Sequence, residues 1–300
     1  MKGVMTQRRM AESIAAGLGT GRGEQYKSWI RVRRQHSSPV SNLYSLHVPL
    51  YARALQLLSG LEFAAANVAI WLGAWEVREQ HPAWPDPHKH PASGLHPDFD
   101  RLLGNVPGLL EIARGCGIDH GVYPGTKIPF VATMDFTLAM GNWTNHRLTH
   151  WSCKPRELLE SAPNRTRLAE RIELETCYAR AGNSQHVVID GTQWTPKLIE
   201  NLDWLRPLRK EQQSFDEGQL RDYAGWVMDS TDPIRVAKAH AATKTGLDRT
   251  ASDGHFRAAA WRGLIDIDLT QDIIMSRPLL RDQACIKSRM KRELLEANHG

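Results

Sequence analysis

Cysteine is scarce in this sequence, and signals of secretion and membrane insertion are absent. The 300 residues include four cysteines and no CxxC pair, which argues against a disulfide-rich secreted scaffold. No apolar segment follows the N-terminal charges, as it would in a signal peptide. Residues 54–75 carry a single charge, but polar residues interrupt them too often for a membrane span. We therefore expect a cytoplasmic protein with reduced thiols and no membrane partner.

Composition predicts a folded chain with more than one domain. Apolar residues make up 41% of the sequence and charged residues 24%, which are ordinary values for a globular protein. The length allows one large domain or two of average size. The sequence becomes more polar after Pro207. We expect a basic, poorly ordered N-terminus over 1–20, one domain over 21–206 and a smaller one over 207–300.

Positive charge is concentrated at the N-terminus. The formal net charge is +5, and residues 1–35 hold eight Lys or Arg against two Glu. A basic segment of this kind is suited to contact with nucleic-acid phosphates, and Arg31, Arg33 and Arg34 are its densest cluster. A solvated segment that binds nothing is an equally good interpretation.

Strand-like and helical segments are mixed along the first two thirds of the chain. Helical composition and apolar spacing predict helices over 50–72, 98–115, 156–181 and 196–205. Alternating or continuous apolar runs predict strands over 25–34, 75–80, 128–140, 147–153 and 185–190. This mixture predicts an α/β domain.

The last third of the chain is predicted to be mainly helical. We expect helices over 208–228, 231–245 and 251–262, followed by a hairpin over 264–280. Helices followed by a hairpin favour a winged-helix-like module. Arg257 and Arg262 are candidates for contact with DNA phosphates. The same basic face could equally dock onto a protein.

Two acids occur in apolar surroundings. Glu62 is the only charge between 54 and 75 and shares a helix face with apolar residues, while Asp135 is the only charge between Lys127 and Arg147. Burying a lone carboxylate is costly unless it is paired or bound to a cation. A divalent metal between the two acids would explain both. For Glu62 alone, capping by a buried Arg or by backbone groups is the simpler interpretation.

Lys154 follows the apolar strand predicted over 147–153. An acid in one strand and a lysine at the end of the next is the arrangement of nucleases written PD…(D/E)xK. Phosphodiester hydrolysis needs an activated water and neutralised charge on the phosphate; carboxylate-bound Mg²⁺ supplies both, and a nearby lysine helps. By itself the pattern is weak evidence.

Many short motifs together carry a family resemblance. In order they are GRG at 21–23, YKSW at 26–29, LSGLE at 58–62, EVREQ at 76–80, YPGT at 123–126, TMDF at 133–136, CKP at 153–155, RIELE at 171–175 and NLDW at 201–204. The chain resembles TnsA, a family of endonuclease subunits of heteromeric bacterial transposases. The resemblance covers about 20–206, and the C-terminal third fits only in its arrangement.

The resemblance implies an α/β, restriction-endonuclease-like PD-(D/E)xK core followed by a small winged-helix-like domain. It implies catalytic roles for Glu62, Asp135 and Lys154, with the metal held by both carboxylates. Glu175 matches a later acid of the site, although Glu173 is an alternative. The implied cofactor is Mg²⁺, with Mn²⁺ as a substitute.

One position departs from the nuclease pattern. Two residues before the lysine, where this class often has an acidic or amide side chain, the chain has Ser152. The Ser152 hydroxyl and the Cys153 backbone carbonyl are the remaining candidate metal ligands there. The departure puts the ligand set in question.

The resemblance also implies a reaction and its partners. The reaction is cleavage of the 5′ strands at double-stranded transposon ends. The implied partners are an integrase-like transposase, which cuts and joins the other strand, and an AAA+-type ATPase regulator. Two alternatives stay open at this point. One is a non-catalytic scaffold with a degenerate nuclease fold, and the other is a stand-alone restriction or repair nuclease.

Overall fold

The computed structural model describes residues 5–30, 44–47, 53–142, 146–161, 165–207 and 215–295. Contacts divide the chain into two compact units. Unit 1 comprises Met1–Leu46, Leu50–Ala69 and Gly73–Thr192; unit 2 comprises His47–Pro49, Ile70–Leu72 and Gln193–Gly300. The domain boundaries expected from the sequence stay a prediction.

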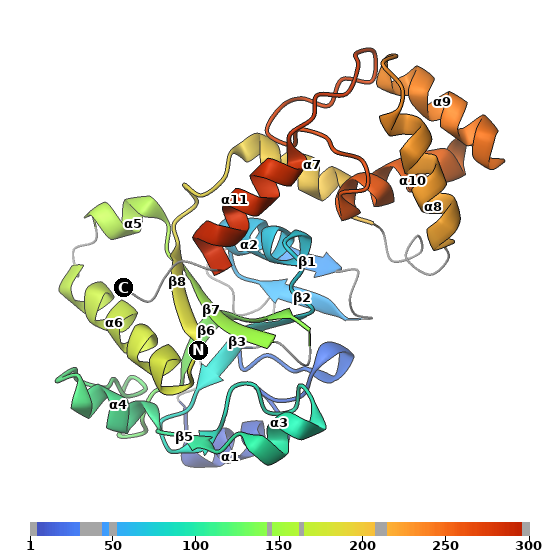
Figure 1. Cartoon of the computed structure of the whole chain (residues 1–300). Helices are drawn as coiled ribbons and strands as arrows, with labels where there is room; N and C mark the ends of the chain where they lie inside the picture. Colours follow the sequence, from blue (N-terminus) through green and yellow to red (C-terminus); the bar gives the residue numbers. More distant parts are fainter. Residues whose placement is uncertain are drawn as a thin grey trace. The chain divides into compact units, whose positions relative to one another are not determined.

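Unit 1 is built around a four-stranded mixed sheet (Figure 1). The strands are β3 (Glu76–Ala83), β6 (Ala132–Gly141), β7 (His146–Cys153) and β8 (Gln185–Ile189), in the order β3-β6-β7-β8. β6 is antiparallel to both β3 and β7, whereas β7 and β8 are parallel. The four strands confirm the expected strands 75–80, 128–140, 147–153 and 185–190, and the unit is α/β.

Helices cover the sheet at its β8 edge. α6 (Arg165–Ala181) packs against β8 and β7, and both α5 (Arg156–Ser161) and α4 (Leu109–Gly115) pack against α6. A core cluster joins Leu109 of α4, Met134 of β6 and Tyr178 of α6, all nearly fully buried. This packing fixes α6, and therefore Glu175, relative to the central strands.

The helix expected over 50–72 is shorter than predicted. Ala54–Leu57 forms strand β2, and helix α2 spans Gly60–Trp71. The reason is a capping motif: the Ser59 hydroxyl accepts the Glu62 N–H at 3.1 Å, and the Glu62 carboxylate accepts the Leu58 N–H at 2.9 Å. Glu62 consequently lies in the first turn of α2 instead of its middle.

The N-terminal segment departs from its sequence-based prediction. α1 (Gln7–Ala15) forms where little regular structure was expected, with Thr6 as its N-cap and no buried residue. No strand starts at residue 25, because a 3₁₀ turn, η1, occupies Gly23–Gln25. A two-stranded sheet instead pairs β1 (Tyr44–His47) with β2. Arg31, Arg33 and Arg34 lie outside the described residues.

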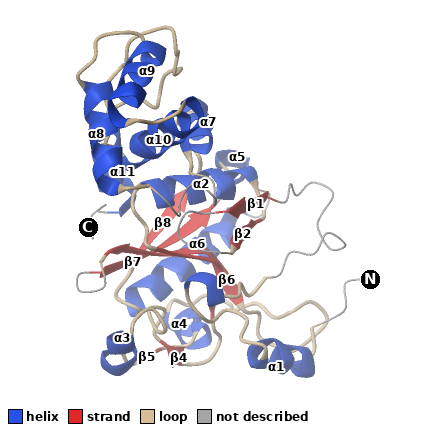
Figure 2. Ribbon diagram, turned by 90° about the vertical axis from the view of Figure 1, so that its right-hand side faces the viewer, coloured by secondary structure: helices blue, strands red, loops and turns tan. Residues whose placement is uncertain are grey.

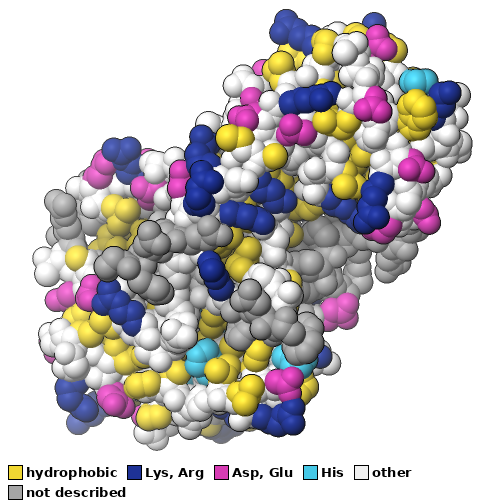
Figure 3. Space-filling model, in the orientation of Figure 1, with side chains coloured by type: hydrophobic (Ala, Val, Ile, Leu, Met, Phe, Trp, Pro, Cys, Tyr) yellow, Lys and Arg dark blue, Asp and Glu magenta, His cyan; other side chains and the backbone are white. Residues whose placement is uncertain are grey.

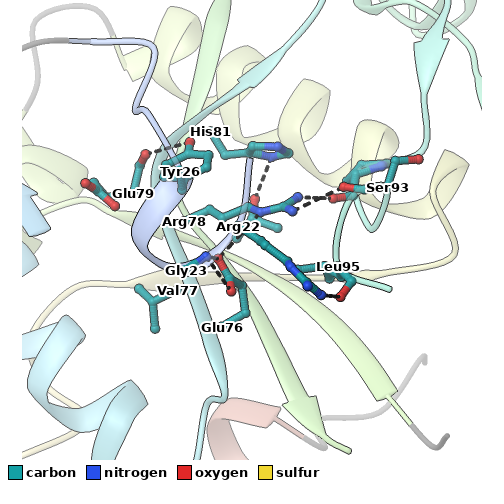
Figure 4. Close-up of polar contacts among 12 residues, drawn as sticks. Arg22, Gly23, Tyr26, Glu76, Val77, Arg78, Glu79, His81, Ser93 and Leu95 are labelled. Atoms are coloured by element: carbon teal, nitrogen blue, oxygen red, sulfur yellow. Dashed lines mark hydrogen bonds and ion pairs between the residues drawn. The ribbon is translucent and has the colours of Figure 1, made fainter. Parts of the chain in front are cut away.

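Polar contacts tie this segment to β3, as Figure 4 shows. The Glu76 carboxylate accepts the Gly23 N–H at 3.0 and 3.1 Å, and the Tyr26 hydroxyl donates to the Glu79 carbonyl at 3.0 Å. Arg53 forms a salt bridge with Glu79 at 2.8 Å. Every residue of β3 is buried, and these bonds supply the partners that buried charges require.

The helix expected over 98–115 is interrupted. α3 (Pro97–Leu102) and α4 are separated by β5 (Asn105–Val106), which pairs with β4 (His88–Lys89). Gly108 precedes α4, and the next two backbone N–H groups donate to the carbonyls of Trp84 and Pro85 at 2.8 and 3.1 Å. Carbonyls of the loop before β4 therefore accept the N–H groups at the start of α4 that have no partner within the helix.

The regular elements of unit 2 in the described residues from 193 onward are helices, joined by non-helical segments (Figure 2). They are α7 (Pro196–Leu205), α8 (Glu217–Met228), α9 (Ile234–Thr245), α10 (Arg249–Arg262) and α11 (Gln283–Leu295). α8, α9 and α10 pack against one another, and α7 packs on α10. None of the helices in the described ranges has the length and apolar content needed to cross a bilayer.

The hairpin expected over 264–280 is wrong, because residues 215–295 contain no strand. One backbone bond joins the two halves of this segment, from the Asp268 N–H to the Leu280 carbonyl at 2.7 Å, but side chains bond other backbone groups. The Asn201 amide donates to the carbonyls of Leu269 and Gln271 at 2.8 Å each, and the Asp268 carboxylate accepts the Thr270 N–H at 2.8 Å. With these groups occupied, the wing of a winged helix does not form.

Candidate active site

Asp135 lies where strand pairing breaks. The β6–β7 register ends at Phe136 opposite Trp151, so the next N–H on β7, that of Cys153, has no strand partner on this side. The Asp135 carboxylate accepts that N–H at 2.7 Å. The carboxylate is 13% exposed, open enough to receive a ligand but fixed by the strand end.

Lys154 reaches the same carboxylate. Its backbone N–H donates to the Ile189 carbonyl at 2.8 Å, which extends the β7–β8 pairing by one residue. Its ammonium then lies 3.0 Å from the Asp135 carboxylate and 3.5 Å from the Cys153 carbonyl oxygen, and its side chain is 6% exposed. The acid and the lysine from neighbouring strands are therefore in contact, as the sequence predicted.

Glu62 faces this pair from helix α2. Burial and, to a smaller extent, the Asp135 charge raise the pKa of Glu62 to about 7. They outweigh the Leu58 N–H, the Lys154 charge and the Gln80 amide, which act in the opposite direction. Part of the capping interpretation is correct, because Glu62 does accept a backbone N–H. The charge of the partly exposed Asp135 nevertheless disfavours ionisation of the buried Glu62, and a shared cation would relieve this repulsion.

A third carboxylate, that of Glu175, contacts Ser152, the residue at which the chain departs from the nuclease pattern. The Ser152 hydroxyl donates to Glu175 of α6 at 2.5 Å and lies 3.0 Å from the His186 Nε2. Arg171, one turn earlier in α6, donates to the other Glu175 oxygen at 2.8 Å. The exposed Glu173 instead accepts from the Cys177 thiol. Of the two candidate acids, Glu175 is therefore the one that contacts Ser152.

The surroundings of Glu175 favour its ionised form. Burial alone would raise the pKa of Glu175, but the hydrogen bonds from His186 and Ser152 and the charges of Lys154 and Arg171 outweigh burial and lower it to about 2. Glu62 and Glu175 thus differ in their tendency to hold a proton at neutral pH. Through Glu175, helix α6 places a carboxylate that favours the charged form beside Ser152, where the strand itself has no acid.

The backbone carbonyl of Cys153, and not its thiol, is the candidate metal ligand at this position. Burial raises the pKa of the Cys153 thiol well above its usual value, and the charges of Asp135 and Glu62 raise it further. A protonated thiol is a poor metal ligand. The Cys153 carbonyl oxygen, close to the Lys154 ammonium, is the group that can face a cation.

The oxygen groups fit a hard divalent cation bound together with a substrate. Within the described ranges, no three His, Cys, Asp or Glu side chains come together as a metal site. Magnesium, however, is commonly held by one or two carboxylates, with waters and substrate phosphates completing its shell. The carboxylates of Glu62 and Asp135 match that requirement. A zinc site formed by protein ligands alone would need more nitrogen or sulfur ligands.

Arg257 and Arg262, the two arginines of unit 2 expected to contact DNA, bond to other groups of the protein. The Arg257 guanidinium donates to the carbonyls of Trp204 and Arg206 at 2.8 and 2.9 Å, at the C-terminal end of α7. Arg262 forms an ion pair with Glu217 of α8. Both side chains join helices of unit 2. On the face of unit 2 that Figure 3 shows, basic and acidic side chains are mixed, and neither kind forms a continuous patch.

Three groups near the carboxylates have no role assigned from the sequence, although Gln80 and Arg171 lie in the motifs EVREQ and RIELE. Gln80 of β3 faces Glu62, while His186 of β8 and Arg171 of α6 orient Glu175. The SxxE spacing of Ser59 and Glu62 was a readable signal for the start of α2. No spacing rule could have found Gln80 or His186, since only strand pairing brings them to the site.

Comparison with known proteins gives one distant similarity. No family model matches the chain. The chain is similar to the transposon Tn7 transposition protein TnsA of Escherichia coli, with 25% identity over 209 residues. The aligned part is 69% of this chain and spans 66%, slightly under two thirds, of that protein. The chain is thus distantly similar to a bacterial transposition protein, in agreement with the resemblance carried by its motifs.

Proposed function

We propose that this chain is a metal-dependent endonuclease that cuts the 5′ strands at transposon ends, with a restriction-endonuclease-like core in unit 1. One observation carries the proposal: Lys154 and Asp135, from the ends of adjacent strands, contact each other beside the buried Glu62. The distant similarity to TnsA supports the transposition context. An integrase-like transposase and an AAA+-type ATPase are the proposed partners.

The residues have separate roles in the proposed reaction. Glu62 and Asp135 would hold Mg²⁺, which supplies an activated water and neutralises charge on the scissile phosphate. Lys154 would turn from Asp135 to the phosphate or to the attacking water, because a cation on Asp135 replaces its present partner. Glu175 would keep a negative charge beside Ser152 and close to the Lys154 side chain.

A second candidate is a non-catalytic scaffold between transposase and regulator. The observation that favours it is the hydroxyl of Ser152 at the usual acid position, bonded to Glu175 and His186. A degenerate site would bind Mg²⁺ or Mn²⁺ no better than an Asp135→Asn variant does. Metal titration of the two proteins therefore separates the candidates.

Strand-specific cleavage tests the proposal directly. Labelled transposon-end DNA is incubated with the partner transposase, the ATPase, ATP and Mg²⁺, and with either wild type or Lys154→Ala. We expect the variant to lose the 5′-strand cut by at least about 100-fold, since a charge-stabilising group contributes on this order. Cleavage of the other strand should be unchanged.

Lys197→Ala is a suitable control, because Lys197 pairs with Glu200 and Asp272 in unit 2. We expect it to cleave as wild type does. Equal 5′ cutting by Lys154→Ala and wild type would contradict the site assignment. Absence of 5′ cutting even by wild type would favour the scaffold.

A further inference from the structure

Gln80 has an unusual backbone. Its φ angle is +49°, and within the described ranges only Asn183 among the other non-glycine residues is also positive, at +44°. Asn tolerates the left-handed region better than Gln does. Asn183 is exposed in the turn after α6, whereas Gln80 is 2% exposed inside strand β3. A strained, buried residue in a strand is a reason to look for function.

The strain coincides with a break in the β3–β6 ladder. Glu79 pairs with Phe136 and His81 with Met134, so Gln80 and Asp135 are skipped between them. The Gln80 carbonyl accepts the Trp29 N–H at 3.3 Å from the N-terminal segment. Since the β6–β7 pairing also ends at Phe136, Asp135 is released from regular pairing on both sides.

The Gln80 side chain is held at one end and unpaired at the other. Its Oε1 accepts the Thr133 hydroxyl at 3.1 Å. Its buried Nε2 makes no hydrogen bond of standard geometry with the described residues, but it faces the Glu62 carboxylate closely enough to favour the ionised form. A buried donor without a full partner is costly, and Glu62 is the group it is aimed at.

We propose that Gln80 is a positioning residue of the metal site, whose strained backbone aims its side-chain amide at the Glu62 carboxylate and orients that carboxylate for the divalent cation. Thr133 fixes the amide by holding its oxygen, so that the NH₂ group points to Glu62. A glycine at this position would relieve the backbone but supply no amide. The inference rests on the proposed function.

Mn²⁺ binding to the full chain tests the proposal without needing partner proteins. Isothermal titration with Mn²⁺ compares wild type with Gln80→Asn, whose shorter side chain withdraws the amide but accepts the left-handed backbone more readily. We expect Mn²⁺ affinity to fall about 10- to 100-fold, as for other residues that orient metal ligands. The melting temperature should not fall.

Three further variants separate positioning from packing. Thr133→Val keeps the shape of the side chain and removes only the hydroxyl, and it should also weaken Mn²⁺ binding. The double variant should bind no more weakly than Gln80→Asn, because both changes act through one amide. Asn183→Gly is the matched strain control, and it should change the melting temperature alone.

The outcomes distinguish the inference from the function it rests on. Wild-type Mn²⁺ affinity in Gln80→Asn and Thr133→Val, with both folded, would overturn the positioning role and leave the nuclease proposal standing. If wild type binds Mn²⁺ no better than Asp135→Asn, the metal-dependent function fails, and the role of Gln80 fails with it.

Discussion

At the scale of single residues, the site combines carboxylates whose surroundings act in opposite directions. Burial and the Asp135 charge outweigh the compensating groups around Glu62 and raise its pKa to about 7. Glu175 receives hydrogen bonds from His186 and Ser152, which together with nearby cations lower its pKa to about 2 in spite of burial. Perturbed carboxylates of this kind are typical of functional sites, and they also make stability depend on pH.

Replacing Glu62 should change the pH dependence of folding. With its pKa raised in the folded state, Glu62 stabilises the metal-free protein most below about pH 4.5, and this contribution is lost as pH rises through about 7. Glu62→Gln removes the titration and should gain about 2–3 kcal/mol relative to wild type between pH 5 and pH 8. Urea unfolding at both pH values measures this.

Saturating Mg²⁺ at pH 8 should reduce or reverse that gain, because the metal stabilises only the protein with the carboxylate. Parallel pH profiles of wild type and Glu62→Gln, without metal, would show that Glu62 does not titrate in this range.

At the scale of elements, close approaches between loops and helices position the helices of unit 1 around its sheet. α4 begins where Gly108 meets the loop before β4, and its first amides bond to that loop. A Cβ built on Gly108 would lie 2.2 Å from the Pro85 carbonyl oxygen. Since α4 supports α6, which carries Glu175, this contact indirectly supports the site.

Gly108→Ala should therefore be destabilising, by about 2–3 kcal/mol, because backbone has to move. Gly115→Ala in the same helix is the control, since a Cβ there meets nothing within 4 Å. The control should be neutral or more stable by up to about 1 kcal/mol. Chemical denaturation of both variants measures the change in unfolding free energy. Equal changes would mean that the loop at Pro85 moves away without loss of stability.

At the scale of the whole molecule, the positive charge is unevenly distributed. The sequence places eight of the basic residues in the first 35 positions. In unit 2, by contrast, Arg257 and Arg262 are bonded to groups of the same unit. Basic residues already occupied inside the protein contribute less to phosphate binding than their number indicates.

Salt dependence of DNA binding should reveal this difference. Replacing Arg31, Arg33 and Arg34 with Ala should reduce the slope of log affinity against log salt on duplex DNA by about 2–3, close to one per lost phosphate contact. Replacing Arg257 and Arg262 should change the slope by less than about 1. The opposite ranking, in proteins with wild-type melting temperatures, would place the DNA contacts in unit 2.

The sequence by itself determined the acids, the lysine and the apolar strands that carry them. Asp135 and Lys154 could be predicted because charges are rare in buried strands, and strand periodicity is a local property. The start of helix α2 is also set locally, by the capping pair Ser59 and Glu62, although the predicted helix began earlier.

Only the tertiary structure decided which other groups meet these residues. Gln80 reaches Glu62 through a break in strand pairing, and Glu175 reaches Ser152 from a helix that follows in sequence. Apolar and polar residues alternate over 264–280 as in a hairpin. The Asn201 amide, about seventy residues earlier, donates to two carbonyls of this segment, and no strand forms. Such contacts depend on hydrogen-bond partners that are distant in sequence, and the periodicity of a local segment carries no information about them.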